Sequence, residues 1–257
     1  MPDLFLELKN EAEGEEVTQA PLSETDALHV LEHAKFSGSR LIPWGSNYSF
    51  AVALEAKDGF TRLAIYKPMA GEAPLYDFPD GTLYLRELAA YLFSRWAGWD
   101  IVPPTVVRDG PHGEGSVQLY IEPDGEQADR EAFWGSRNPS VERLVLFDHL
   151  VNNADRKIGH CLRDPAGKVW GIDHGLTFSP EPKLRTALWQ FVGEPISPEL
   201  LAEITTLCRR SSELYGVLKE VLNRDEIDAV IRRIEHFSAL GAYPLLNPRR
   251  NIPYGWW

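Results

Sequence analysis

The chain has 257 residues, of which 44% are hydrophobic and 25% are charged, and this composition is typical of a soluble globular protein with a substantial core. Its net charge of -12 argues against a general nucleic-acid-binding surface, because such surfaces need basic stripes to displace counterions, but it leaves room for a small basic pocket that binds a phosphorylated ligand. The sequence contains no apolar run long enough to span a bilayer and no signal-peptide pattern, and therefore predicts a cytoplasmic protein without stable membrane association. Its two cysteines lack metal-ligand spacing and are expected to be reduced thiols.

The first 37 residues combine an acidic run at residues 11–16, typical of a solvated tail or linker, with a helix that Ser23 is expected to cap. After Gly38 the character changes to short segments that are rich in β-forming residues and separated by turn signals. Three such segments are expected to be strands of an antiparallel meander: residues 40–44, 49–55 and 61–66.

The middle of the chain adds a helix and a second pair of strands. Apolar periodicity and the breaker Pro103-Pro104 predict a helix over residues 82–96. Strands are expected over residues 105–108 and 116–122, and Pro123-Asp124-Gly125 reads as a linker. Residues 38–123 should therefore form a β-rich lobe with one helix.

Residues 124–257 are expected to form a mainly helical lobe, so that the whole chain is a bilobal α+β protein. Asn138 and Pro139 are suited to cap and begin an apolar helix over residues 141–151. A short strand follows at residues 169–172. Two amphipathic helices complete the lobe, one opened by Ser197-Pro198 and one preceded by Asn223.

Three features of the predicted β-rich lobe suit nucleotide phosphates. The turn that contains Ser46, Asn47, Tyr48 and Ser49 offers backbone N–H and hydroxyl groups, although a plain hairpin turn has the same composition. Lys67 ends an apolar strand, where it either extends to solvent or reaches a phosphate. Glu87 lies on an apolar stretch of the following helix and needs a partner there, for which Lys67 is available.

The polar loop at residues 152–160 lies between an apolar helix and a short strand, where a rigid scaffold positions functional groups. Asp155 is a candidate general base, and Asp173 is a candidate ligand for a hard cation such as Mg²⁺. Arg156 and Lys157 either neutralise a phosphate or pair with nearby acids. The alternative is a surface turn whose Asn and Asp residues cap the backbone.

In this order, the features resemble the kinase fold. The likeness is to the phosphatidylinositol 3- and 4-kinase superfamily in particular, with the type II phosphatidylinositol 4-kinases closest and HipA-like bacterial kinases more distant. It spans residues 40–180 and is carried by residues 64–68, 86–92, 101–103, 115–122, 153–156 and 172–178. The resemblance implies a compact bacterial kinase-like protein with a bilobal fold.

The resemblance also implies roles for individual residues in binding ATP and transferring its γ-phosphate. Asp155 would accept the proton of the attacking hydroxyl, and Asp173 would hold the metal that bridges the phosphates. The loop of Ser46, Asn47, Tyr48 and Ser49 would cover the phosphates, and Lys67, oriented by Glu87, would contact them. The backbone of Tyr120, Ile121 and Glu122 would contact the adenine, mainly at Ile121.

The sequence departs from the family pattern in two ways. His160 stands where the family usually has an Asn as a second metal ligand, and nitrogen suits Mn²⁺ better than Mg²⁺. Asn152 or Asn153 are alternative ligands. The chain also lacks the cysteine-rich palmitoylation stretch of the type II lipid kinases, and its acidity would repel an anionic membrane. We therefore expect a soluble protein or small molecule as the phosphate acceptor.

Two other functions remain open from the sequence. His160 and the lack of a recognisable substrate-docking segment would also suit a pseudokinase, whose nucleotide pocket regulates a partner. The same ATP site would also permit transfer of AMP to a protein. Residues 247–257 are either a tail packed on the surface through its aromatic residues or a partner-docking peptide.

Overall fold

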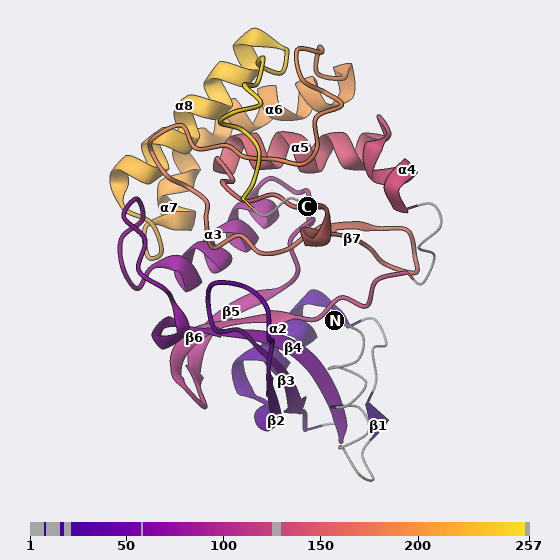
Figure 1. Ribbon diagram of the computed structural model, residues 1–257, viewed down its shortest axis with the longest axis vertical. Helices are drawn as coiled ribbons and strands as arrows, with labels where there is room; N and C mark the ends of the chain where they lie inside the picture. The colour runs from indigo at the N-terminus through magenta and orange to yellow at the C-terminus, as the bar shows by residue number, and fades with distance from the viewer. Residues whose placement is uncertain (1–7, 9–15, 18–21, 58, 125–129, 255–257) are drawn as a thin grey trace. The chain divides into compact units, whose positions relative to one another are not determined.

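The computed structural model describes residues 8, 16–17, 22–57, 59–124 and 130–254. Most of the predicted acidic run, together with Asp58, Gly125 and the last three residues of the tail, lies outside these ranges. The chain divides into two compact units, residues 1–88 with 103–122 and residues 89–102 with 123–257. The first is β-rich and the second is mainly helical (Figure 1), which confirms the predicted α+β class.

The first unit is built on a six-stranded sheet. Its order is β2-β3-β4-β6-β5, and β1 pairs in parallel with β4 while the other neighbours are antiparallel. The strands are β1 (Glu16–Val17), β2 (Lys35–Leu41), β3 (Phe50–Glu55), β4 (Phe60–Pro68), β5 (Thr105–Gly110) and β6 (Gly113–Leu119). Alternate residues of β3 enter two different core clusters, Val52 and Leu54 on one side and Ala51 and Ala53 on the other, as strand geometry requires.

Some of the strand limits expected from the sequence were wrong. The strand expected at residues 40–44 is β2, which begins at Lys35 and ends at Leu41. Gly38 does not break it, because the register of β2 against β3 shifts between Phe36 and Gly38, as at a β-bulge. Residues 120–122 lie beyond the end of β6, and Glu16, expected in a solvated tail, belongs to β1.

Two helices belong wholly or partly to the first unit. Helix α2 (Glu24–His33) begins at its predicted cap, where the Ser23 side chain accepts a hydrogen bond from the Asp26 N–H at 3.2 Å. Helix α3 (Leu83–Trp96) carries Glu87, and its first turn is held by the Glu72 carboxylate, which accepts hydrogen bonds from the N–H groups of Leu83 and Tyr84. The segment after β4, which includes the 3-10 helix η1 (Met69–Gly71), thereby positions the helix that carries Glu87.

The second unit packs helices around α5 (Pro139–Val151), whose cap Asn138 was predicted. The other elements are α4 (Arg130–Gly135), η2 (Ile158–His160), β7 (Cys161–Arg163), β8 (Val169–Gly171), α6 (Pro198–Arg210), η3 (Ser211–Glu213), α7 (Leu214–Leu218) and α8 (Arg224–Leu240). Helices α5, α6 and α8 lie together in Figure 1, and β7 and β8 form a small hairpin. Within the described ranges, none of the helices is long and apolar enough to cross a membrane.

His149 on α5 makes the second unit sensitive to acid. Its ring is buried against Phe237 and Tyr243, with centroids 5.2 and 5.6 Å away, and burial lowers the pKa of His149 from 6.5 to about 3. The unfolded chain therefore binds a proton between pH 6.5 and pH 3 that the folded chain does not, and stability falls as the pH falls through this window.

We expect His149 to account for roughly 1 kcal/mol of the stability lost between pH 7 and pH 5.5, and the variant His149→Phe to lack this contribution. Phenylalanine retains an aromatic ring at the position but has no titrating nitrogen. Urea unfolding of both proteins at the two pH values measures the difference. Equal pH dependence in the wild type and the variant would contradict the assignment.

Candidate active site

The first unit brings Lys67 and Glu87 together, as the sequence suggested. Lys67 lies near the end of β4, and its Nζ is 2.5 Å from Oε1 of Glu87 on α3. The Glu87 side chain is 2% exposed and that of Lys67 is 24% exposed. Removing either partner of such a pair leaves a buried charge, so the pair fixes the position of the lysine amine.

The loop between β2 and β3, residues 42–49, is tied to the segment that follows β4. Oδ1 of Asn47 accepts a hydrogen bond from the Ala73 N–H at 2.8 Å, and the Tyr48 N–H donates to the Gly71 carbonyl at 2.9 Å. The backbone approaches closely at this point, because a Cβ on Gly71 would lie 2.7 Å from the Tyr48 carbonyl oxygen. The Asn47 side-chain oxygen therefore holds the loop in place, while Ser46 and the Tyr48 side chain are exposed.

Residues 120–122 follow β6 as an irregular segment. The Tyr120 N–H donates to the Leu63 carbonyl of β4 at 3.1 Å, which extends the sheet by one bond. Burial, together with the charge of Glu122, raises the pKa of Tyr120 to about 12, so its phenol stays neutral at physiological pH. The predicted adenine-contacting residue Ile121 thus lies directly after a backbone position fixed to β4.

In the second unit, helix α5 leads into the polar loop through two buried asparagines. The Asn152 side chain makes three hydrogen bonds to the backbone of residues 179–183, at 2.6 to 2.9 Å. The Asn153 side chain donates to Asp148 and accepts from the Asp155 N–H, both at 2.9 Å. Both side-chain oxygens accept backbone N–H groups, so these residues hold the loop, and a role for either as a substitute metal ligand stays a prediction.

Asp155 has the surroundings of a general base. Its side chain is 21% exposed, and Lys157 Nζ lies 2.8 Å from Oδ2. Burial raises the pKa of Asp155, while the hydrogen bond and charge of Lys157 oppose this rise. A partly buried carboxylate with a raised pKa is a better proton acceptor than an exposed one.

His160 and Asp173 face each other beside this loop. Nδ1 of His160 lies 3.0 Å from the Asp155 carbonyl oxygen, which can only accept, so we place the ring proton on Nδ1. Nε2 lies 3.2 Å from Oδ2 of Asp173, and Asp173 has a φ of 60°. Imidazole nitrogen and carboxylate oxygen are both donor types for divalent metal ions, and these two predicted metal ligands lie close enough to contact one ion.

These two residues can supply only part of a metal site. Across the described residues, the protein groups no three His, Cys, Asp or Glu side chains in a way that would hold a metal ion alone. A cation at His160 and Asp173 would therefore need further ligands from a bound phosphate or from water, which is the usual situation of Mg²⁺ in nucleotide sites.

The sequence did not identify the buried network around Arg156. Its guanidinium is 0% exposed and contacts both oxygens of Asp148 at 2.8 and 2.9 Å. It also donates to the carbonyls of His160 and Ile172 and contacts Nε2 of His174 at 2.8 Å, so that all five N–H groups have acceptors. Burial alone would lower the pKa of Arg156, but the charge of Asp148 and the hydrogen bonds to it raise the pKa.

Arg156 is therefore a structural clamp and does not contact phosphate. It holds the backbone carbonyls of His160 and of Ile172, the residue before Asp173. The one signal in the sequence was Asp148, a carboxylate within the apolar run of α5, where burial requires a partner.

The comparisons with known proteins identify a family. No family model matches the chain. Protein Rv2133c of Mycobacterium tuberculosis is 36% identical over 267 residues, which cover 87% of this chain and 94% of that protein. The chain belongs to the Rv2133c family.

This member of the Rv2133c family has a kinase-like fold. A hydra Fam20 structure matches 86% of this chain and 89% of its own, with a TM-score of 0.57 and 14% identity. A Golgi casein kinase structure matches 84% of this chain and 74% of its own, with a TM-score of 0.52 and 13% identity. The structure of the Helicobacter pylori proinflammatory kinase CtkA matches 82% of this chain and 94% of its own, with a TM-score of 0.50 and 10% identity.

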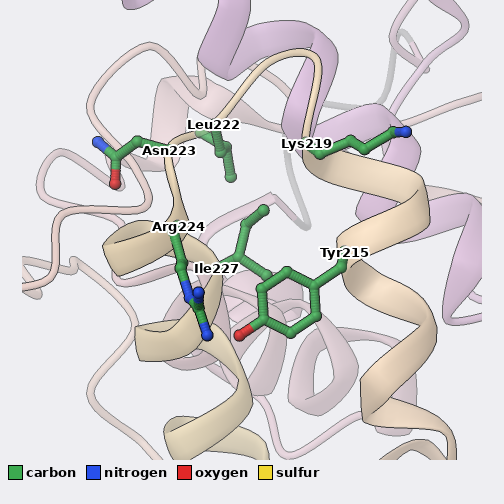
Figure 2. Close-up of a pocket in the computed structure, with 6 residues that line it drawn as sticks. All are labelled: Tyr215, Lys219, Leu222, Asn223, Arg224 and Ile227. Atoms are coloured by element: carbon green, nitrogen blue, oxygen red, sulfur yellow. The ribbon is translucent and has the colours of Figure 1, made fainter.

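A pocket of about 500 Å³ in this Rv2133c-family protein is lined by none of the residues predicted to be functional. It is lined by Tyr215, Lys219, Leu222, Asn223, Arg224 and Ile227. Tyr215 and Ile227 face its interior, whereas the ends of the Lys219 and Asn223 side chains extend away from it (Figure 2). The Tyr215 hydroxyl already donates to Asp228, whose carboxylate also lies 3.9 Å from Nε of Arg224.

Proposed function

We propose that the chain is an ATP-dependent phosphotransferase of the phosphatidylinositol 3-/4-kinase-like type, which transfers the γ-phosphate to a hydroxyl of a soluble protein or small molecule. The observation that carries the proposal is Asp155, a partly exposed carboxylate whose pKa is raised by burial, with Lys157 at 2.8 Å. Such a group in a kinase-like fold is suited to accept the proton of an attacking hydroxyl.

In this proposal residues 38–123 are the N-lobe and contain the nucleotide-binding side chains. Lys67, oriented by the buried Glu87, contacts the ATP phosphates, and the 2.5 Å ion pair supports this role. The backbone of residues 46–49 covers the phosphates, and the backbone at Ile121 contacts the adenine edge.

Residues 124–257 are the C-lobe and carry the reacting groups. Asp155 takes the hydroxyl proton while its carboxylate is held by the loop that Asn153 orders. Asp173 and His160 would hold Mg²⁺ or Mn²⁺, which, when bound, neutralises charge on the phosphates. Arg156 keeps the backbone of both ligands in position.

The phosphatidylinositol 3-/4-kinase-like type is supported by the order Asp155-Arg156, because ordinary protein kinases have Arg before Asp in this loop. A cytoplasmic location without nucleic-acid or stable membrane partners is part of the proposal and is supported by the net charge of -12.

The melting temperature with and without ATP, in Mg²⁺ and separately in Mn²⁺, tests the nucleotide site. ATP at about 100 times its dissociation constant should stabilise the fold by about 2.7 kcal/mol, which raises the melting temperature by roughly 5–10 °C for a chain of this size. We expect the shift to require the metal and to disappear in Asp173→Ala, because the carboxylate ligand is lost.

Asp225→Ala is the matched control, since Asp225 is an exposed aspartate in the first turn of α8, and it should retain the full shift. Absence of a shift in both metals for the wild type would overturn the proposal. A shift without transfer to any acceptor would favour the pseudokinase function. ATP labelled on the α- or the γ-phosphate distinguishes AMP transfer from phosphoryl transfer.

The metal preference should depend on His160. We expect His160→Asn to lower the affinity for Mn²⁺ relative to Mg²⁺ by about tenfold, because an imidazole nitrogen favours Mn²⁺ and an amide oxygen does not. Mn²⁺ binding followed by electron paramagnetic resonance in the presence of ATP, with Mg²⁺ as competitor, measures the ratio. An unchanged ratio would remove His160 from the ligand set.

A further inference from the structure

A second segment lies directly against the loop that carries Asp155. Residues 183–187 run beside it and exchange backbone hydrogen bonds with it. The Arg185 N–H donates to the Asn153 carbonyl at 2.9 Å, and the Arg156 N–H donates to the Arg185 carbonyl at 3.0 Å. Arg185 is therefore fixed beside the candidate base by the backbone of both segments.

The Arg185 guanidinium reaches the backbone of the loop that carries Asp155. Its Nη1 lies 3.5 Å from the carbonyl oxygen of Ala154, the residue before Asp155. This long contact is the single hydrogen bond that the guanidinium makes within the described part of the chain. The side chain is half-buried, and its other N–H groups have no hydrogen-bond partner among the described residues.

The C-terminal segment also contacts this arginine and its neighbours. The Tyr254 ring lies 4.7 Å from the guanidinium carbon of Arg185. Two hydrogen bonds join Asn251 to the Arg185 segment, from its side chain to the Leu184 carbonyl at 2.6 Å and from the Thr186 N–H to its carbonyl at 2.9 Å. Stacking on a tyrosine orients a guanidinium and leaves its N–H edge exposed.

The side chains around this loop include positive charges, although the chain as a whole is acidic. The protein carries a net charge of -12, yet two cations contact this loop, Lys157 at the Asp155 carboxylate and Arg185 at the Ala154 carbonyl. Lys157 is paired with Asp155, whereas Arg185 has no carboxylate partner in the described ranges. A planar guanidinium in this state is suited to bind a phosphate or carboxylate through two parallel hydrogen bonds.

We propose that Arg185 binds the anionic group, a phosphate or a carboxylate, of an acceptor that is a small hydroxyl compound. This inference rests on the proposed phosphotransferase function. The acceptor hydroxyl oxygen forms a bond to the γ-phosphorus, and its proton goes to the Asp155 carboxylate. The bond between the γ-phosphorus and the bridging oxygen breaks, and ADP leaves with the electron pair.

Three compounds that share one carbon skeleton test the proposal: glycerol, glycerol 3-phosphate and glycerate. Binding of each to the full chain, saturated with a non-hydrolysable ATP analogue and Mn²⁺, is measured by isothermal titration calorimetry. We expect one or both anions to bind while glycerol does not, and the stronger anion identifies phosphate or carboxylate as the recognised group.

Arg185→Gln should weaken binding of the anion by about tenfold or more, because hydrogen bonds to a charged group are lost. Arg185→Lys keeps the charge without the planar fork and should be intermediate, and Tyr254→Phe should retain the wild-type affinity. Arg209→Gln, which changes an exposed arginine of α6, is the matched control and should bind as the wild type does.

The proposal is overturned if neither anion binds to the nucleotide-loaded protein, or if Arg185→Gln binds them as tightly as the wild type. The melting temperature with the ATP analogue is recorded on the same samples. A normal shift with no anion binding refutes the role of Arg185 alone, whereas no shift refutes the phosphotransferase function and this inference with it.

Discussion

The variant Asp155→Asn should lose phosphoryl transfer by about 10²–10⁴-fold, the range that general-base catalysis supplies. Asparagine has nearly the same shape and keeps the backbone hydrogen bond to Asn153, but its amide does not accept the hydroxyl proton. Lys157 loses its partner, which has a small effect because its side chain is 35% exposed. The measurement is the initial rate of γ-phosphate transfer from ATP.

Nucleotide binding separates a chemical effect from a folding effect in this variant. We expect the ATP-dependent rise in melting temperature to stay within a few degrees of the wild type, since Asp155 is not assigned to the metal or the phosphates. Asp225→Asn on α8 is the matched substitution and should transfer at the wild-type rate. Full turnover in Asp155→Asn would show that Asp155 is not the base.

The parts of the site that sequence reasoning found share one property, namely that each polar residue stands out within a local apolar pattern. Lys67 ends an apolar strand and Glu87 interrupts an apolar helix, and the structure places them 2.5 Å apart. The helix caps Ser23, Asn138 and Asn223 were likewise local signals, and each begins a helix.

The buried network could not be read in the same way, because its contacts depend on the path of the chain. Arg156 meets Asp148, which is eight residues away, and His174, which is 18 residues away, with a hairpin in between. A sequence offers Arg156 many acids at similar separations. The backbone groups that the side chains of Asn152 and Asn153 hold were likewise not evident from the sequence, because the Asn152 partners lie 27 to 31 residues further along the chain.

Local signals gave wrong strand limits where one residue type occurs in two kinds of structure. Gly38 resembles a strand boundary, but it lies at a register shift within β2, a position where glycine also occurs. The short helices α4 and α7, of six and five residues, carry too few turns for a periodic pattern and were not predicted.

Replacing Arg156 should have the largest effect on stability. We expect Arg156→Met to lower the free energy of unfolding by about 3–5 kcal/mol, because the Asp148 carboxylate, which is 1% exposed, would remain buried without its partner. The carbonyls of His160 and Ile172 would lose their donor as well. Urea unfolding at pH 7.5 measures the loss, and Arg209→Met on α6 should change stability by less than about 0.5 kcal/mol.

A second substitution shows whether the cost arises from the stranded carboxylate. Asp148→Leu combined with Arg156→Met removes both charges, so the double variant should be more stable than the sum of the two single losses predicts. Arg156→Lys keeps the charge but offers three donors in place of five, and should fall between the wild type and Arg156→Met. If Arg156→Met unfolds at the wild-type urea concentration, the five contacts do not stabilise the loop. If it is destabilised but keeps the wild-type metal-dependent ATP shift, the clamp serves the fold and does not position His160 and Asp173.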